Sequence, residues 1–264
     1  MKYVVVTGAY GGMGSQTVKL LTQKGFTVFA LDKKVLEEEE GVVPIEVDLT
    51  NAEKVKDAFN KVKTFTDDLY AIIHFAGIYS LDSLIEIPDE DFERIVKINF
   101  CGAFYVNKYF SPLLKKGSKI IITTSELAPL NPLPFTGIYA VTKSALDKYA
   151  YSLRMELQLL GVAVSVIRAG AVSTTMLNVS TSALDKFCAK TTNFRCNADR
   201  FKQIVNSVEA KSIVPKKIAI KTVKILKKKN PKFAFNINRN KLLLLLNVLP
   251  SRMQFWIIKK ILKK

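Results

Sequence analysis

A turn that holds four glycines within seven residues, at positions 8, 11, 12 and 14, constrains this chain more than any other feature. Residues 2–6 before it have the composition of a short buried strand, and the apolar spacing of residues 18–21 after it predicts a helix that ends near Gly25. Glycines let the backbone approach a pyrophosphate closely, and a helix N-terminus attracts that anion. The order of strand, glycine turn and helix predicts a dinucleotide-binding unit rather than a merely flexible loop. The expected cofactor contacts in the turn are Gly8, Tyr10, Gly12, Met13 and Gly14.

Two aspartates at strand ends extend this prediction. The second strand, over residues 27–31, ends at Asp32, whose carboxylate can accept hydrogen bonds from ribose hydroxyls and would repel a 2′-phosphate. Asp32 therefore favours NAD as the cofactor over NADP, although Lys33 and Lys34 weaken the distinction. A third strand, over residues 42–47, ends at Asp48, which can bond the adenine amino group or cap a helix over residues 51–63.

A second group of polar side chains follows later strands. A strand over residues 70–75 runs into Ala76 and Gly77, and a long helical stretch over residues 89–114 carries Asn99. The strand over residues 119–124 ends at Ser125. A helix over residues 136–160 then places Tyr139 and Lys143 four residues apart, on one face of its first turns. Since open α/β sheets bind ligands at the carboxyl ends of their strands, we expect these side chains to meet there.

The residue types in this group suit proton transfer to a carbonyl oxygen. A tyrosine has a pKa of about 10 and is a poor acid–base group at neutral pH, but a neighbouring ammonium lowers that pKa. Lys143 would supply this charge and reach a nicotinamide ribose, Ser125 would bond the carbonyl, and Asn99 would anchor a water that links Lys143 to solvent. A Tyr-x-x-x-Lys pair is a weak signal in a chain with 40 basic residues. Its position after a strand-end serine strengthens it.

Together these pieces resemble the classical short-chain dehydrogenase/reductase family over roughly residues 2–175. The resemblance implies a Rossmann-type, doubly wound α/β fold with a parallel sheet of about seven strands flanked by helices. It also implies an Asn99–Ser125–Tyr139–Lys143 tetrad and a homodimer or homotetramer. Besides Tyr139 and Lys143, the further cofactor contacts it indicates are Asp48, Leu49, Ala76, Gly77, Val172 and Thr174.

Three departures from the family pattern stand out. His74 and Phe75 replace the usual asparagines after strand four, and we interpret His74 as a strand residue rather than a catalytic one. Ala169 replaces the usual proline before Gly170. The spacing from Ser125 to Tyr139 is one residue longer than usual, which would place Glu126 in the serine position. Because a glutamate there makes poor chemistry, an extra loop residue between the two is the better interpretation.

The length of 264 residues fits one α/β domain with an appendage. We expect a nucleotide-binding domain over residues 1–235, with a substrate loop at 174–214, and a basic amphipathic extension over residues 236–264. The three cysteines have neither metal-ligand spacing nor a disulfide framework, so no metal site is expected. The absence of a leader sequence and of an apolar run long enough to cross a bilayer predicts a cytoplasmic protein.

The charge is concentrated at the C-terminus. Residues 211–264 contain 16 basic and no acidic side chains, whereas residues 1–210 contain 24 basic and 23 acidic ones. On a helical wheel of residues 250–264 one arc is apolar, formed by Phe255, Ile257, Ile258, Ile261 and Leu262. The other arc is basic, with Arg252, Lys259, Lys260, Lys263 and, near it, Trp256. This pattern predicts either peripheral attachment to an anionic membrane or a helix packed on a dimer partner, and nucleic-acid binding is disfavoured.

The expected substrate is a lipophilic secondary alcohol or ketone, with NAD(H) as cofactor and Tyr139 as the acid–base group. The apolar residues that suggest it are Met176, Leu177, Leu184, Phe187, Phe194 and Phe201, with Leu133, Pro134 and Phe135 beside Tyr139. The Leu-Pro-Phe segment resembles hydroxysteroid dehydrogenases. Two alternatives stay open. The first is a 3-oxoacyl carrier-protein reductase, which Asp32 disfavours, and the second is a nucleotide-binding scaffold or sensor without turnover, which the complete tetrad disfavours.

Overall fold

The computed structural model describes residues 2–37, 39–209 and 211–263, with the side chains of residues 175–181 and 208–209 left outside the description. Within this part of the chain the strands form one seven-stranded parallel sheet in the order β3-β2-β1-β4-β5-β6-β7. The strands are β1 (Lys2–Thr7), β2 (Phe26–Asp32), β3 (Val42–Glu46), β4 (Leu69–His74), β5 (Leu114–Ser125), β6 (Ala163–Ala169) and β7 (Ala234–Ile237). The Rossmann-type prediction is confirmed.

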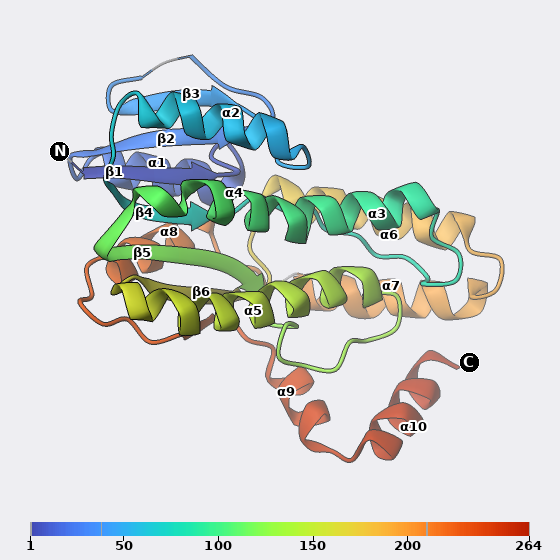
Figure 1. Ribbon diagram of the computed structural model, residues 1–264. Helices are drawn as coiled ribbons and strands as arrows, with labels where there is room; N and C mark the ends of the chain where they lie inside the picture. The colour runs from blue at the N-terminus through green and yellow to red at the C-terminus, as the bar shows by residue number, and fades with distance from the viewer. Residues whose placement is uncertain (1, 38, 210, 264) are drawn as a thin grey trace.

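Helices cover both faces of the sheet (Figure 1). One apolar cluster joins the sheet to α2, α4 and α5, and a second joins it to α1 and α8 on the other face. The helices are α1 (Gly12–Thr22), α2 (Ala52–Lys63), α3 (Asp89–Val96), α4 (Gly102–Phe110), α5 (Gly137–Leu157), α6 (Thr175–Lys190), α7 (Arg195–Glu209), α8 (Pro215–Leu226), α9 (Lys241–Val248) and α10 (Ser251–Leu262). The strands are continuous apolar runs because they are buried on both faces.

The strand order reverses between β1 and β4, and this reversal positions the candidate site. Thr7 at the end of β1 pairs with His74 at the end of β4, so the glycine turn and the Ala76–Gly77 segment leave the sheet side by side. A crevice at such a reversal is where doubly wound sheets bind ligands.

The expected continuous helix over residues 89–114 is interrupted. A π-helical turn, Lys97–Cys101, separates α3 from α4, and β5 already begins at Leu114. Asn99 lies in this turn, and its amide bonds both the backbone of Ile78 and the hydroxyl of Thr142. π-turns within helices are frequent at functional sites, where they redirect a side chain.

The segment over residues 174–214 folds into α6 and α7, which lie beyond the carboxyl ends of the strands (Figure 1). The turn between them is held by Glu86, whose carboxylate accepts hydrogen bonds from residues Thr191, Thr192 and Asn193. These bonds lower the pKa of Glu86 to about 2, the bond from Thr191 being the largest cause. Leu262 at the end of α10 is buried in the same apolar cluster as Phe201 of α7, so the C-terminal helix packs on its own chain.

Candidate active site

The glycine turn is shaped to admit an anion. Gly8 has a φ of +65°, and a Cβ on Gly14 would lie 2.0 Å from the carbonyl oxygen of Gly8, so neither position tolerates a side chain. The first turn of α1 has no side-chain cap on its N–H groups and no acidic residue. Uncapped N–H groups and a positive helix end fit the pyrophosphate of a dinucleotide.

A hollow of about 470 Å³ adjoins this turn. It is lined by Gly12, Ser15, Thr174 and Lys216, among others. A Cβ on Gly12 would lie 2.7 Å from the side chain of Thr174, so the glycine lets the start of α6 and α1 approach each other closely at the hollow. The residues here suit a phosphate group, and Lys216, which the sequence analysis did not single out, adds a basic side chain to them.

The strand-end aspartates are held differently from each other. Asp32 accepts hydrogen bonds from the backbone N–H groups of Tyr10, at 3.0 Å, and Lys33, at 2.8 Å. Asp48 accepts two hydrogen bonds from Thr50 and forms an ion pair with Lys33, at 3.3 Å. The cap of α2 is Asn51, which accepts hydrogen bonds from the N–H groups of two residues of the first turn. The suggestion that Asp48 caps that helix is therefore wrong.

The structure brings the four tetrad residues together. Tyr139 and Ser125 are both buried, and their hydroxyls form a hydrogen bond. The ammonium of Lys143 lies 3.4 Å from the carbonyl oxygen of Thr123 and 5.8 Å from the centre of the Tyr139 ring. A Cβ on Gly77 would lie 3.2 Å from both Lys143 Nζ and Asn99 Oδ1, which places these two groups around one glycine. The serine that bonds Tyr139 is Ser125, so the extra-residue interpretation holds.

Burial sets the titration of Tyr139 and Lys143. Desolvation is the largest influence on Tyr139 and, together with the charge of Glu126, outweighs the hydrogen bond from Ser125 and raises its pKa to about 12. Desolvation lowers the pKa of Lys143 to about 8. The sequence predicts that the neighbouring ammonium lowers the pKa of Tyr139. The structure shows the opposite direction because both groups are withdrawn from water.

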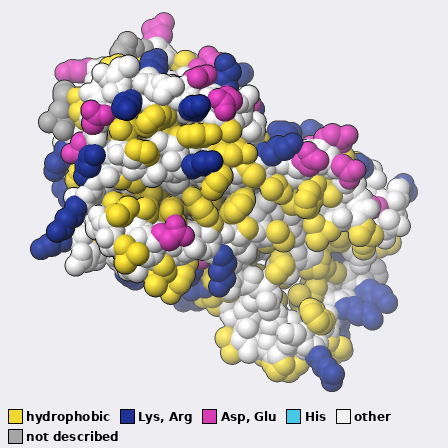
Figure 2. Space-filling model, viewed as in Figure 1, with side chains coloured by type: hydrophobic (Ala, Val, Ile, Leu, Met, Phe, Trp, Pro, Cys, Tyr) yellow, Lys and Arg dark blue, Asp and Glu magenta, His cyan; other side chains and the backbone are white. Residues whose placement is uncertain are grey.

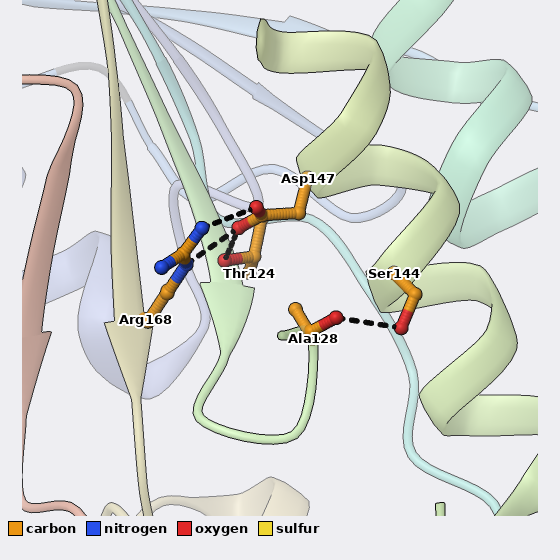
Figure 3. A network of polar contacts seen from close by, with 5 residues as sticks. All are labelled: Thr124, Ala128, Ser144, Asp147 and Arg168. Atoms are coloured by element: carbon orange, nitrogen blue, oxygen red, sulfur yellow. Dashed lines mark hydrogen bonds and ion pairs between the residues drawn. The ribbon is translucent and has the colours of Figure 1, made fainter. Parts of the chain in front are cut away.

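Asp147 fastens the helix of the tetrad to the sheet (Figure 3). This buried residue of α5 receives two hydrogen bonds from Arg168 of β6, at 2.9 and 2.6 Å, and one from Thr124 of β5, at 3.1 Å. Ser144 of the same helix bonds the carbonyl of Ala128, at 2.9 Å. Thr124 directly precedes Ser125, so these contacts fix the serine relative to Tyr139 and Lys143. The sequence does not predict these contacts, because no local pattern links α5 to β6.

His74 is buried at the end of β4, and its Nε2 lies 2.9 Å from Asn107 Oδ1. Asn107 in turn donates to the hydroxyl of Tyr149. Burial lowers the pKa of His74 to about 4, against the raising effect of Asn107. These contacts keep a neutral imidazole inside the structure, as expected for a strand residue.

A cavity of about 540 Å³ opens above the tetrad. Ser125, Tyr139 and Lys143 line it, together with Met13, Val172 and Thr174 from the cofactor side. Of the apolar residues expected to shape it, Leu133, Pro134 and Phe201 do so. Leu184, Phe187 and Phe135 are instead core residues, Phe194 packs beside them, and the side chains of Met176 and Leu177 lie outside the described residues.

The largest apolar contribution to the cavity comes from the C-terminal helices, which the sequence analysis did not assign to the site. From α9 the lining residues are Leu242, Leu243, Leu245 and Leu246, and from α10 they are Ile257, Ile258, Ile261 and Leu262. Most of the apolar arc of α10 is therefore used within the chain. Phe255, the fifth member of that arc, is 69% exposed.

Glu126 connects the two parts of the site. It is buried beside Ser125, and its Oε2 accepts the N–H of Asn240, at 2.5 Å, where α9 begins. Burial raises the pKa of Glu126, partly offset by this bond and by the charge of Arg239.

Comparison with known proteins places this geometry in a family. The model of short chain dehydrogenases matches residues 2–185. The chain belongs to the short-chain dehydrogenase family. A mouse protein named estradiol 17-beta-dehydrogenase 2 is 36% identical over an alignment of 185 residues that covers 66% of this chain and 49% of that protein. This chain thus spans about half of that relative.

Two further similarities extend past the matched region. A 3-ketodihydrosphingosine reductase of Bacteroides thetaiotaomicron is 24% identical over 255 residues, which cover 96% of this chain and 92% of that protein. The crystal structure of a short chain dehydrogenase family protein from Francisella tularensis superposes with a TM-score of 0.76 at 22% identity, over 90% of this chain and 97% of that one. The latter similarity supports the fold alone.

Proposed function

We propose that this short-chain dehydrogenase transfers a hydride between NAD(H) and a lipophilic secondary alcohol or ketone. One observation carries the proposal: the hydrogen-bonded hydroxyls of Tyr139 and Ser125 line a cavity of about 540 Å³ whose walls are largely apolar, with leucine and isoleucine the most frequent side chains. A cavity of this kind suits an apolar substrate with one polar reacting group. Two relatives bear the names of enzymes that act on a steroid and a sphingoid ketone, which agrees with this substrate class.

The residues have the following proposed roles. Bound NAD(H) would accept or supply the hydride. Ser125 would donate a hydrogen bond to the substrate oxygen and hold it against Tyr139. Tyr139 is a neutral phenol at physiological pH, since its pKa is raised to about 12, and it would donate its proton to the oxygen as an alkoxide develops. Lys143 would hold the cofactor ribose, and Asn99 would hold the Ala76–Gly77 segment through the backbone of Ile78.

Replacement of the phenol tests the catalytic role. Tyr139→Phe should lower kcat by about 100-fold or more, the usual contribution of a general acid, because it removes the proton while keeping the ring. Its affinity for NADH should stay nearly unchanged. Tyr151→Phe on the exposed face of the same helix is the matched control. The assay is NADH oxidation over a panel of steroids, retinoids and acyl ketones, and full activity in Tyr139→Phe would refute the assignment.

We propose NAD rather than NADP as the cofactor. Asp32 ends β2 beside the glycine turn, and Lys33, the nearest basic residue, is paired with Asp48 instead of being held toward a phosphate. Fluorescence titration should show tighter binding of NADH than of NADPH, and Asp32→Ser should narrow the difference by removing the repulsive charge. Tighter binding of NADPH by the unchanged protein contradicts this role for Asp32.

Two proposals concern partners. We propose a homodimer or homotetramer that uses exposed apolar residues of α4 and α5, which include Phe104, Val141, Tyr151 and Met155 (Figure 2). Sedimentation velocity should show a shift toward monomer in the double variant Tyr151→Glu with Met155→Glu.

We also propose that residues 1–235 carry the chemistry, while residues 236–264 attach the protein peripherally to an anionic membrane. In the described part of the chain, no helix is long and apolar enough for a bilayer-crossing segment.

A further inference from the structure

The C-terminal flap, defined here as residues 240–263, has two faces with different surroundings. Its inner face completes the cavity above Tyr139 through Leu243 and Leu246 of α9 and Ile257 and Ile258 of α10. Its outer part projects from the body of the molecule (Figure 1). The flap is thus a wall of the reaction chamber and a part of the surface at the same time.

Polar contacts hold the flap on the body at several points. Asn240 donates its N–H to Glu126, next to Ser125. Asn131, in the loop before α5, donates to Asn247 at 2.7 Å and to the buried Gln254 at 3.1 Å. Asn197 of α7 bonds the carbonyl of Leu262 at 2.7 Å. These bonds fix the position of the flap on the body.

The mouth of the cavity has an apolar rim. Three side chains that line the cavity are nevertheless exposed, namely Leu242 at 73%, Leu245 at 64% and Ile261 at 44%. A residue can do both only where the cavity meets the surface. A substrate that enters here passes between leucine and isoleucine side chains rather than between polar ones.

Other apolar side chains of the flap are exposed without lining the cavity. Val248 is 81% exposed, Phe255 69% and Trp256 62%, and none of the three lines the cavity. Several large apolar side chains exposed on one short segment are unusual for a protein that contacts only water. Basic residues stand among them, and Lys260 lies 4.9 Å from the centre of the Trp256 ring. Figure 2 shows hydrophobic and basic side chains together on this projecting part.

Charge decides which partner fits this surface. Residues 211–264 contain no acidic side chain, so a second copy of the flap would be repelled by it. On the flap the exposed basic residues are Lys241, Arg252, Lys259, Lys260 and Lys263. An anionic bilayer attracts such residues with about 1 kcal/mol each and accepts tryptophan and phenylalanine at its interface. Its anionic headgroups match the basic side chains of the flap, and its acyl region matches the exposed apolar ones.

We propose that the flap is a membrane-facing portal, which lies on an anionic phospholipid bilayer and passes lipids dissolved in that bilayer directly into the cavity. The proposal rests on the proposed function and narrows its substrate to molecules that partition into membranes. Lys259, Lys260, Phe255 and Trp256 contact the bilayer, and Leu242, Leu245 and Ile261 form the entrance.

Vesicle binding tests the surface without any catalysis. The full chain should sediment with vesicles of equal parts phosphatidylcholine and phosphatidylserine, and much less with phosphatidylcholine alone. Lys259→Glu with Lys260→Glu should lower the bound fraction several-fold, as should Phe255→Ser with Trp256→Ser. The matched control is Lys54→Glu with Lys63→Glu, which makes the same charge change on exposed residues of α2. Equal loss in the control, or no loss in the flap variants, overturns the proposal.

Substrate presentation tests the portal itself. The unchanged protein is assayed by NADH oxidation with cyclohexanone in buffer and with a long-chain methyl ketone dissolved in the anionic vesicles. Phe255→Ser with Trp256→Ser should lower the rate on the vesicle-borne ketone about as much as it lowers binding, and leave the rate on cyclohexanone unchanged. Equal rates on the vesicle-borne ketone overturn the portal. Loss of the dimer in the same variant, seen by sedimentation velocity, also overturns it and identifies a second copy as the occupant.

The failure of the portal and the failure of the proposed function are distinguishable. If the unchanged protein reduces neither ketone nor any member of the wider panel, the proposed function fails, whatever the vesicle binding shows. If the unchanged protein reduces cyclohexanone, but the flap variants bind vesicles as well as the α2 control variant does, the portal alone fails.

Discussion

At the scale of single residues, burial dominates the chemistry of this protein. Tyr139, Lys143 and His74 can be identified from the sequence. Their pKa values, however, depend on how far folding removes them from water. Desolvation disfavours the charged form of each group, so the pKa of the phenol rises and those of the amine and the imidazole fall. The partner side chains modify these shifts without reversing them.

His74 makes stability sensitive to acid. Its pKa is about 4 in the folded protein, below the ordinary 6.5, so the unfolded chain binds more protons between these values. Stability therefore rises with pH across this window and is lost as the pH falls through it, by about 2 kcal/mol between neutrality and about pH 5. Urea unfolding at the two pH values measures the loss, and His74→Asn should reduce it. An equal loss in that variant would show that other groups are responsible.

Asp147 should matter for stability although it touches no reacting group. Asp147→Asn removes the partner of a largely buried Arg168 and should destabilise the fold by about 3 kcal/mol, as expected when one half of a buried ion pair is lost. Urea unfolding provides the measurement. Glu93→Gln, which removes an exposed pair with Lys97, is the matched control and should change stability little. Comparable effects from the two variants would contradict the stabilising role of the contacts of Asp147 with Arg168 and Thr124 in Figure 3.

At the scale of elements, the site is assembled from the ends of strands and the starts of helices. Adjacent carboxyl ends bring the glycine turn beside Ala76, and α5 begins where β5 and its loop have placed Ser125. No single strand or helix contains all the residues of the candidate active site. The π-turn shows the same dependence, since Asn99 gains its position from partners on β4's loop and on α5.

The turn between β1 and α1 should not tolerate a methyl group. A Cβ on Gly14 would lie 2.0 Å from the oxygen of Gly8, so Gly14→Ala must displace the turn and weaken NADH binding by about tenfold or more. Gly25→Ala is the matched control. Its φ is +76° but its surroundings are open, so it should lower stability by about 1 kcal/mol and leave NADH affinity unchanged. NADH fluorescence titration and thermal unfolding separate the two effects, and unchanged affinity in Gly14→Ala would refute the phosphate role.

At the scale of the whole molecule, two parts distant in the sequence share one cavity. Ser125 at the end of β5 and Tyr139 of α5 lie on one side of it, and residues beyond 240 supply an apolar wall. Under the proposed function, we expect selectivity and chemistry to be carried by different parts of the chain.

Truncation after Arg239 should separate these contributions. The sheet keeps β7, and the cofactor residues lie upstream, so NADH binding should persist. The cavity loses one apolar wall, and the preference in kcat/KM for long-chain over short-chain ketones should fall by about tenfold, the amount expected for a few methylene contacts. Parallel assays with both ketones measure this ratio. A ratio equal to that of the full chain would mean that the flap does not shape the cavity.

The sequence by itself determined the Rossmann-type fold, the glycine turn and the positions of the tetrad residues. These follow from local patterns, since strand and helix periodicity, a turn that excludes side chains and an i, i+4 pair are each visible within a short stretch. The basic character of the C-terminal segment was equally visible, because charge is a matter of composition.

Only the tertiary structure decided what surrounds these residues. It showed that Leu184 and Phe187 are core while the leucines of α9 line the cavity, that Asp147 clamps α5 to β6, and that burial raises the pKa of Tyr139. Each depends on contacts between segments far apart in the chain. A helical wheel shows that α10 is two-faced, but which face meets the cavity depends on where the sheet and α7 lie.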